Sequence, residues 1–129
     1  MNGLEVYQNV LTSDQCSYLI KLFDESNRKE SGKILAPEGL REDPTIKTST
    51  DLQLNFLHKE DKKFKDIILE PLLKRIGLFK DKYAFLGICD RWDISGEYNI
   101  QRYNDGEGFF KPHCEHGANN PYRMLAWMI

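Results

Sequence analysis

The segment from Tyr98 to Gly117, YNIQRYNDGEGFFKPHCEHG, constrains this chain more than any other. It combines a strand pattern, a glycine turn and two of the three histidines. Residues 98–103 alternate with a period of two, which predicts a half-buried β-strand. Residues 104–108 are typical of a turn, and the Asp-Gly pair within them favours a positive φ. A second extended run then leads to His113.

The pair His113 and Glu115 is the main candidate for metal binding. Residues i and i+2 of an extended strand project from the same face, so these two side chains are expected to point together. An imidazole and a carboxylate are two corners of the 2-His-1-carboxylate set that binds non-haem Fe(II). The third ligand of the set is missing. Cys114 and His116 are expected on the opposite face, and His58 lies far upstream in an exposed polar segment. A His-x-Glu pair also arises by chance on many surfaces, so spacing alone leaves metal binding open.

The segment QRYNDGEGFFKPHCEHG, followed by YRMLAWMI, resembles the 2-oxoglutarate- and Fe(II)-dependent oxygenases of the prolyl 4-hydroxylase type. In that family a strand ending in Tyr precedes a Gly-containing loop, a His-x-Asp motif and a strand that begins with Arg. Upstream, VLTSDQCSYLIKLFDES is similar to the family's first helix, and KTSTDLQL to the polar segment before its second helix. The resemblance implies an α+β fold. Its core would be an incomplete double-stranded β-helix, jelly-roll or cupin-like, with N-terminal helices packed on the sheet.

The resemblance also implies roles for individual residues. His113 matches the first iron ligand, and Glu115 stands where the family usually has Asp, one methylene shorter. Tyr103 matches the tyrosine that contacts 2-oxoglutarate. Further residues near the site are Gly106, Gly108 and Arg123.

The implied function is hydroxylation of an unactivated carbon, most simply in a prolyl residue of a peptide or protein. The reaction is coupled to decarboxylation of 2-oxoglutarate to succinate. It requires O2, 2-oxoglutarate and Fe(II), and ascorbate is a further cofactor of such enzymes.

The family's second histidine, and its Arg or Lys that pairs with the 2-oxoglutarate carboxylate, would both lie beyond Ile129. The chain therefore resembles the first part of an oxygenase, and alone it is expected to be inactive. The apolar run over residues 125–129 is also expected of a strand that lacks its neighbours. One alternative is a non-catalytic jelly-roll binding module that has lost iron chemistry. Another is a structural Zn(II) site at residues 113–116, although four adjacent residues of a strand cannot converge on one ion.

Composition and charge exclude several classes of function. A net charge of −2 and a pI near 5.9 give no reason to expect a nucleic acid or an anionic membrane as partner. Because we see no secretion signal and no apolar run of transmembrane length, we expect a cytoplasmic protein. Three widely spaced cysteines favour reduced thiols. The length bounds one domain, so residues 1–129 are expected to form a single, partial oxygenase domain.

Two helices are predicted. A capping box from Thr12 to Gln15 begins a helix over about 13–27, in which Cys16 is expected to be a small buried hydrophobe. The second helix covers 61–76; Pro71 should kink or divide it, and Gly77 should stop it.

The remaining segments are predicted as strands and loops. Core strands are expected from about 83 to 129, beginning with Tyr83–Ile88 and ending with Met124–Ile129. A weaker strand is expected over 47–54, in which Ser49 and Asp51 are candidates to line a pocket, although solvent exposure is the simpler interpretation. Residues 3–10 are interpreted as a short strand or a lead-in segment, and residues 28–44 as a loop.

Overall fold

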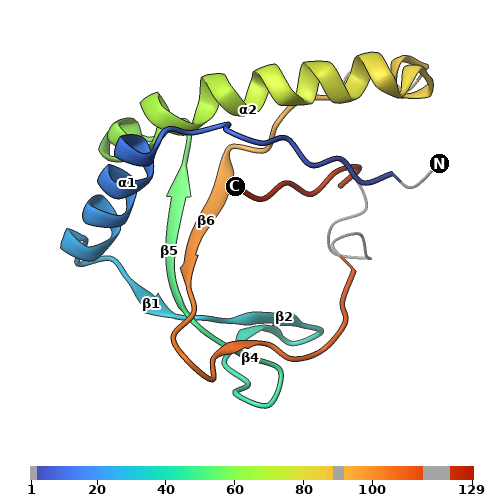
Figure 1. Cartoon of the computed structure of the whole chain (residues 1–129). Coiled ribbons are helices and arrows are strands. Elements are labelled where there is room, and N and C mark those ends of the chain that lie inside the picture. Colours follow the sequence, from blue (N-terminus) through green and yellow to red (C-terminus); the bar gives the residue numbers. More distant parts are fainter. Residues whose placement is uncertain (1–2, 89–91, 115–122) are drawn as a thin grey trace. The chain divides into compact units, whose positions relative to one another are not determined.

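The structure of the chain is a computed structural model that describes residues 3–88, 92–114 and 123–129 (Figure 1). Within these residues the chain forms the α-helices α1 (Ser13–Glu25) and α2 (Lys62–Lys82). Two short 3-10 helices, η1 (Lys59–Asp61) and η2 (Ala84–Gly87), lie before and after α2. None of these helices is long and apolar enough to cross a lipid bilayer.

The strands of the described residues form three small sheets. The strands are β1 (Glu30–Ser31), β2 (Ile34–Ala36), β3 (Gly39–Arg41), β4 (Lys47–Thr48), β5 (Thr50–Asn55), β6 (Glu97–Arg102) and β7 (Gly108–Phe109). The sheet orders are β1-β5-β6, β2-β3 and β4-β7, and the pairs β1–β5, β2–β3 and β4–β7 are antiparallel. The predicted α+β class is confirmed. These sheets do not close into a barrel within the part of the chain that the structure describes.

The chain divides into two compact units. Unit 1 contains residues 1–29 and 52–100, and unit 2 contains residues 30–51 and 101–129. Strands β5 and β6 each contain one of the boundaries, so the chain passes from one unit to the other within regular structure.

The predicted capping box begins α1. The Thr12 hydroxyl accepts a hydrogen bond from the Gln15 backbone N–H at 3.2 Å, and the Gln15 side chain accepts one from the Thr12 N–H at 2.8 Å. These bonds satisfy two N–H groups that a helix start leaves without partners. The prediction for Cys16 is wrong, because its side chain is exposed. Phe23 is the buried residue of α1. The covered part of the helix face that Cys16 shares with Phe23 therefore lies two turns after Cys16.

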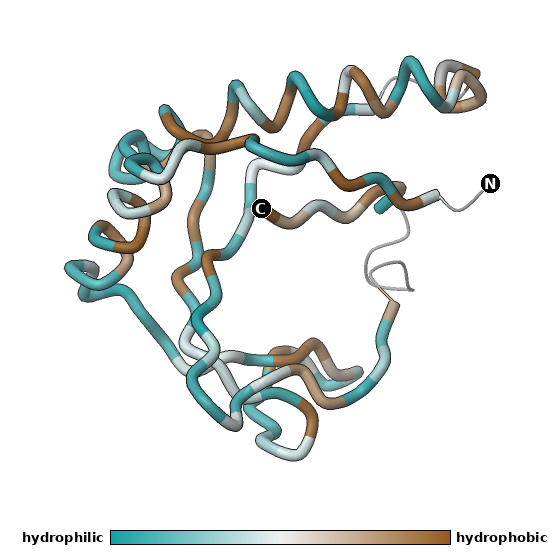
Figure 2. Tube along the Cα trace, in the orientation of Figure 1, coloured by the Kyte–Doolittle hydropathy of each residue, from teal (hydrophilic) through white to brown (hydrophobic). Residues whose placement is uncertain are grey.

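Helix α2 continues through both of the predicted breaks. Pro71 and Gly77 lie inside it, and Tyr83 forms its C-cap. Phe64, Ile68 and Leu72 are buried along one stripe that spans Pro71. Packing of this stripe outweighs the backbone hydrogen bond that proline removes. Figure 2 shows hydrophobic and hydrophilic stretches alternating along α2, as expected for a helix with one covered face.

Nearly all the buried apolar side chains of the described residues belong to unit 1. They are Phe23, Leu52, Leu54, Phe56, Phe64, Ile68, Leu72, Tyr83, Leu86 and Tyr98, whereas unit 2 contributes only Ala36. The rings of Phe56 and Tyr98 stack with their centroids 4.1 Å apart, linking the end of β5 to β6.

Two predicted core strands are wrong. Residues 84–87 form the 3-10 helix η2, and Leu86 within it is buried three positions after its N-cap Tyr83, which is also buried. That spacing fits three residues per turn and does not fit the two-residue period of a strand. Residues 123–129 have no regular secondary structure, because no strand of the described residues pairs with them. Residues 3–10 likewise form no strand.

The predicted loop over residues 28–44 instead contains β1 and the β2–β3 hairpin. Leu35 pairs with Leu40 across this hairpin. The backbone turns at Pro37-Glu38 and enters Gly39 with a φ of 119°, which favours glycine. Each strand is only two or three residues long, too short for an alternating pattern to be visible in the sequence.

Candidate functional site

The segment that dominates the sequence folds as predicted over most of its length. Strand β6 ends at Arg102, and Tyr103 follows it directly. In the turn, the Glu107 N–H donates to the Asn104 carbonyl at 2.9 Å, and the Glu107 carboxylate accepts from the Asn104 N–H at 2.8 Å. Gly106 has a φ of 79°, where a side chain would be strained. The Asp-Gly turn is therefore confirmed.

Strand β7 returns along β4. Lys47 pairs with Phe109 and Thr48 with Gly108, and the Phe110 N–H extends the pairing by donating to the Ile46 carbonyl at 2.7 Å. A Cβ on Gly108 would lie 3.3 Å from the Phe110 ring, a tight contact that favours glycine. Both glycines of the predicted site thus shape the backbone between Tyr103 and His113.

His113 is exposed and lies beyond the end of β7. Its ring stacks on Phe109, with centroids 3.9 Å apart and planes at 17°. Its Nδ1 lies 3.4 Å from the Lys111 carbonyl oxygen. The prediction that His113 belongs to a strand is wrong, because the pairing with β4 ends at Phe109. Its predicted partner Glu115 lies outside the described residues.

No three His, Cys, Asp or Glu side chains gather closely enough to hold a metal ion within residues 3–88, 92–114 and 123–129. Arg123 belongs to unit 2, is exposed, and does not begin a strand in this structure. The described residues therefore supply His113 from the predicted metal site and Tyr103 from the predicted co-substrate site.

A partly buried polar cluster lies in unit 2, centred on the carboxylate of Asp51. Its Oδ1 accepts from the Ser49 hydroxyl at 2.6 Å. Its Oδ2 accepts from the Lys47 ammonium at 2.6 Å and from Nε2 of Gln101 at 3.1 Å. The side chains of Lys47 and Asp51 are only 4% and 14% exposed. Three charge-assisted hydrogen bonds to one shielded carboxylate connect these side chains.

Gly32 closes one side of the cluster. Its N–H donates to the Ser49 carbonyl at 2.9 Å. A Cβ at this position would lie 2.1 Å from the Ser49 hydroxyl oxygen and 3.0 Å from Cε of Lys47. Lys47 and Ser49, which this backbone approaches closely, are both buried.

Tyr103 joins the same cluster through Gln101. The phenol donates to Oε1 of Gln101 at 3.2 Å, and the Tyr103 side chain remains 41% exposed. Burial is the largest cause that raises the pKa of Tyr103 above its ordinary value, and the negative charge of Asp51 adds to it. The Ser49 hydroxyl acts in the opposite direction. The phenol is protonated at neutral pH, as tyrosine ordinarily is, and it donates its proton to Gln101.

Sequence reasoning gave no role to Lys47 and Gln101. A period of two in the sequence could have placed these residues on common strand faces. Lys47, Ser49 and Asp51 alternate along one segment, and Gln101 and Tyr103 along another. Alternating polar residues usually indicate a solvated strand face, which is why burial was not expected.

No protein-family model, no curated protein and no solved structure matches this chain significantly. The basis for a function is therefore the resemblance of the sequence together with the geometry of residues in unit 2.

Proposed function

We propose that this chain contributes His113, Glu115 and Tyr103 to the site of an Fe(II)- and 2-oxoglutarate-dependent oxygenase with a double-stranded β-helix core. The substrate proposed by resemblance is a prolyl residue in a peptide or protein. One observation carries the proposal. Tyr103 and His113 flank a single turn-and-strand segment of unit 2, whose backbone is shaped by Gly106 and Gly108 in the order that the resemblance requires.

His113 has the chemistry of a metal ligand. With a proton on Nδ1 of His113 directed at the Lys111 carbonyl, Nε2 carries the lone pair that a metal needs. Stacking on Phe109 restricts the orientation of this ring. His113, with Glu115, would hold Fe(II). The chemistry supplied at the site when Fe(II) is bound is oxidation of an unactivated C–H bond by O2, with 2-oxoglutarate converted to succinate and CO2.

Tyr103 fits the co-substrate. A carboxylate of 2-oxoglutarate is an acceptor, and the Tyr103 phenol is a donor that is neutral at neutral pH, as tyrosine ordinarily is. A phenolate at this position would repel the dianion. The environment of Tyr103 therefore favours recognition of a carboxylate by a neutral hydrogen bond.

The two exposed histidines of the described residues give a matched test. His58 in unit 1 lies 3.7 Å from Glu60 and has no part in the proposed site. In a protein that combines this chain with the second histidine and the Arg or Lys that the resemblance requires, we expect His113→Ala to abolish Fe(II) binding, measured by anaerobic calorimetry, and succinate formation with a prolyl peptide. His58→Ala should leave both unchanged. Unchanged turnover in His113→Ala would overturn the assignment. Absence of Fe(II) binding by the wild-type protein would instead favour the non-catalytic binding module.

A further inference from the structure

Asp51 determines how Gln101 is oriented. A carboxylate only accepts hydrogen bonds, so the side-chain amide of Gln101 must present its Nε2 to Asp51, as it does at 3.1 Å. The opposite orientation would place two oxygens against each other. The amide oxygen of Gln101 consequently faces Tyr103.

The orientation of Gln101 in turn fixes the phenolic proton of Tyr103. An amide oxygen cannot donate, so in the contact of 3.2 Å the phenol donates to Gln101. The chain of bonds runs from Asp51 through Gln101 to Tyr103. A ligand carboxylate that takes the phenolic proton must compete with Gln101 for it.

Two opposite charges of one ion pair belong to the network that ends at Tyr103. Asp51 is negative and its ion-pair partner Lys47 is positive, with both side chains shielded from water. Because shielded charges are weakly screened, removing either one leaves a net charge that a bound dianion would sense.

We propose that Asp51 and Gln101 are positioning residues for Tyr103 and that, with Lys47, they set the affinity of the site for the 2-oxoglutarate dianion. This inference rests on the proposed function. Asp51 holds the amide, the amide holds the phenol, and the pairing of Lys47 with Asp51 limits the net charge of the network. No contact of Asp51 with the ligand is required.

The first test compares the signs of two substitutions on 2-oxoglutarate binding, measured by anaerobic calorimetry with Fe(II) present. Asp51→Asn keeps the shape but leaves Lys47 uncompensated, so the dissociation constant should fall by about tenfold. Gln101→Glu places a second negative charge against Asp51, so the constant should rise by about tenfold. A purely structural role predicts weaker binding in both. Gln53→Glu, the same change at an exposed position of β5, is the control and should have little effect.

A double variant keeps the test interpretable if Asp51→Asn binds poorly through loss of structure. Lys47→Met combined with Asp51→Asn restores neutrality and should return the dissociation constant to near the wild-type value. Lys47→Met alone leaves Asp51 unpaired and should weaken binding. If Asp51→Asn and Lys47→Met each weaken binding and the double variant does not recover it, the proposed role in affinity is overturned.

The second test needs neither metal nor ligand. The pKa of the Tyr103 phenol is obtained from ultraviolet titration as the difference between each protein and its Tyr103→Phe counterpart. Asp51→Asn should lower this pKa, because a negative neighbour is removed and Lys47 is left positive. If no variant binds 2-oxoglutarate but the pKa falls as expected, the proposed function fails and the Asp51 network stands. An unchanged pKa would overturn the network itself.

Discussion

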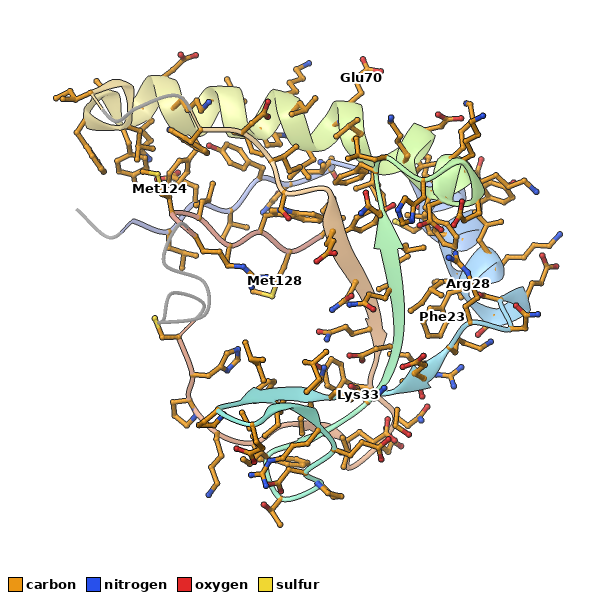
Figure 3. The ribbon with its side chains drawn as sticks, turned by 180° about the vertical axis from the view of Figure 1, so that it is seen from behind. Phe23, Arg28, Lys33, Glu70, Met124 and Met128 are labelled. Atoms are coloured by element: carbon orange, nitrogen blue, oxygen red, sulfur yellow. The ribbon has the colours of Figure 1, made fainter. Side chains whose placement is uncertain are left out.

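Asp61 shows how a single buried charge organises unit 1. Its carboxylate is fully buried, accepts from the Asn55 backbone N–H at 2.8 Å and pairs with the guanidinium of Arg28. Arg28 follows α1 in the chain (Figure 3), and its side chain is 42% exposed. Loss of Asp61 leaves an arginine that water can reach, whereas loss of Arg28 leaves a charge that water cannot reach. The exposed partner is therefore the more costly one to remove.

We accordingly expect Arg28→Met to lower the free energy of unfolding by about 3 kcal/mol and Asp61→Asn by about 2 kcal/mol. Urea unfolding followed by circular dichroism measures both. As a control, Lys21→Met removes one partner of the exposed Lys21–Glu25 pair on α1 and should change stability by less than about 0.5 kcal/mol. If Arg28→Met is no more costly than this control, the buried pair has no role in stability.

At the residue scale, the sequence showed which side chains have polar or reactive groups but not which of them are buried. The Asp-Gly turn was predictable because its signal is local. Asp51 was interpreted as a solvated residue, and its burial depends on Gln101, 50 residues further along the chain. Cys16 has the spacing of a core position yet is exposed, because burial depends on how far a neighbour covers the helix face. A pattern along one segment does not contain this information.

Helix α2 allows a prediction at the scale of an element. Gly77 lies in its interior, and a Cβ there would meet no heavy atom within 4 Å. Glycine in a helix costs backbone entropy that alanine does not, so Gly77→Ala should raise the free energy of unfolding by about 1 kcal/mol. Thermal and urea unfolding measure the gain. Gly32→Ala is the control and should lower the free energy of unfolding, because its Cβ would clash with the Ser49 hydroxyl. A loss of stability in Gly77→Ala would mean that a further group packs against this position.

Elements with strong local signals were predicted well, and those defined by their partners were not. The Thr12 capping box gave the start of α1, and the alternation over residues 98–103 gave β6. Strands β1 to β4 have two or three residues each, so their existence follows from pairing with distant segments. Pro71 and Gly77 were interpreted as breaks because local propensity disfavours both in helices, and tertiary packing overrode that preference.

At the scale of the whole chain, the apolar core lies in unit 1 and the candidate site lies in unit 2. Apart from Ala36, the buried apolar side chains of the described residues lie in unit 1, whereas the buried side chains of unit 2 include Lys47 and Ser49. Burial of apolar surface is the main source of stability, and local opening occurs where such burial is least. Unit 2 is therefore expected to open at lower free energy than unit 1. A site built there can adjust to a ligand without unfolding the core.

Hydrogen exchange measured by mass spectrometry tests this division. Amides in α2 should exchange much more slowly than amides in the β2–β3 hairpin, because α2 packs three buried apolar side chains and the hairpin only Ala36. Leu52 is fully buried in unit 1, so Leu52→Ala should lower the free energy of unfolding by about 3 kcal/mol and accelerate exchange in α2. Exchange in the hairpin should hardly change, because its amides already exchange through local opening. Equal acceleration in both would show that the two units unfold together.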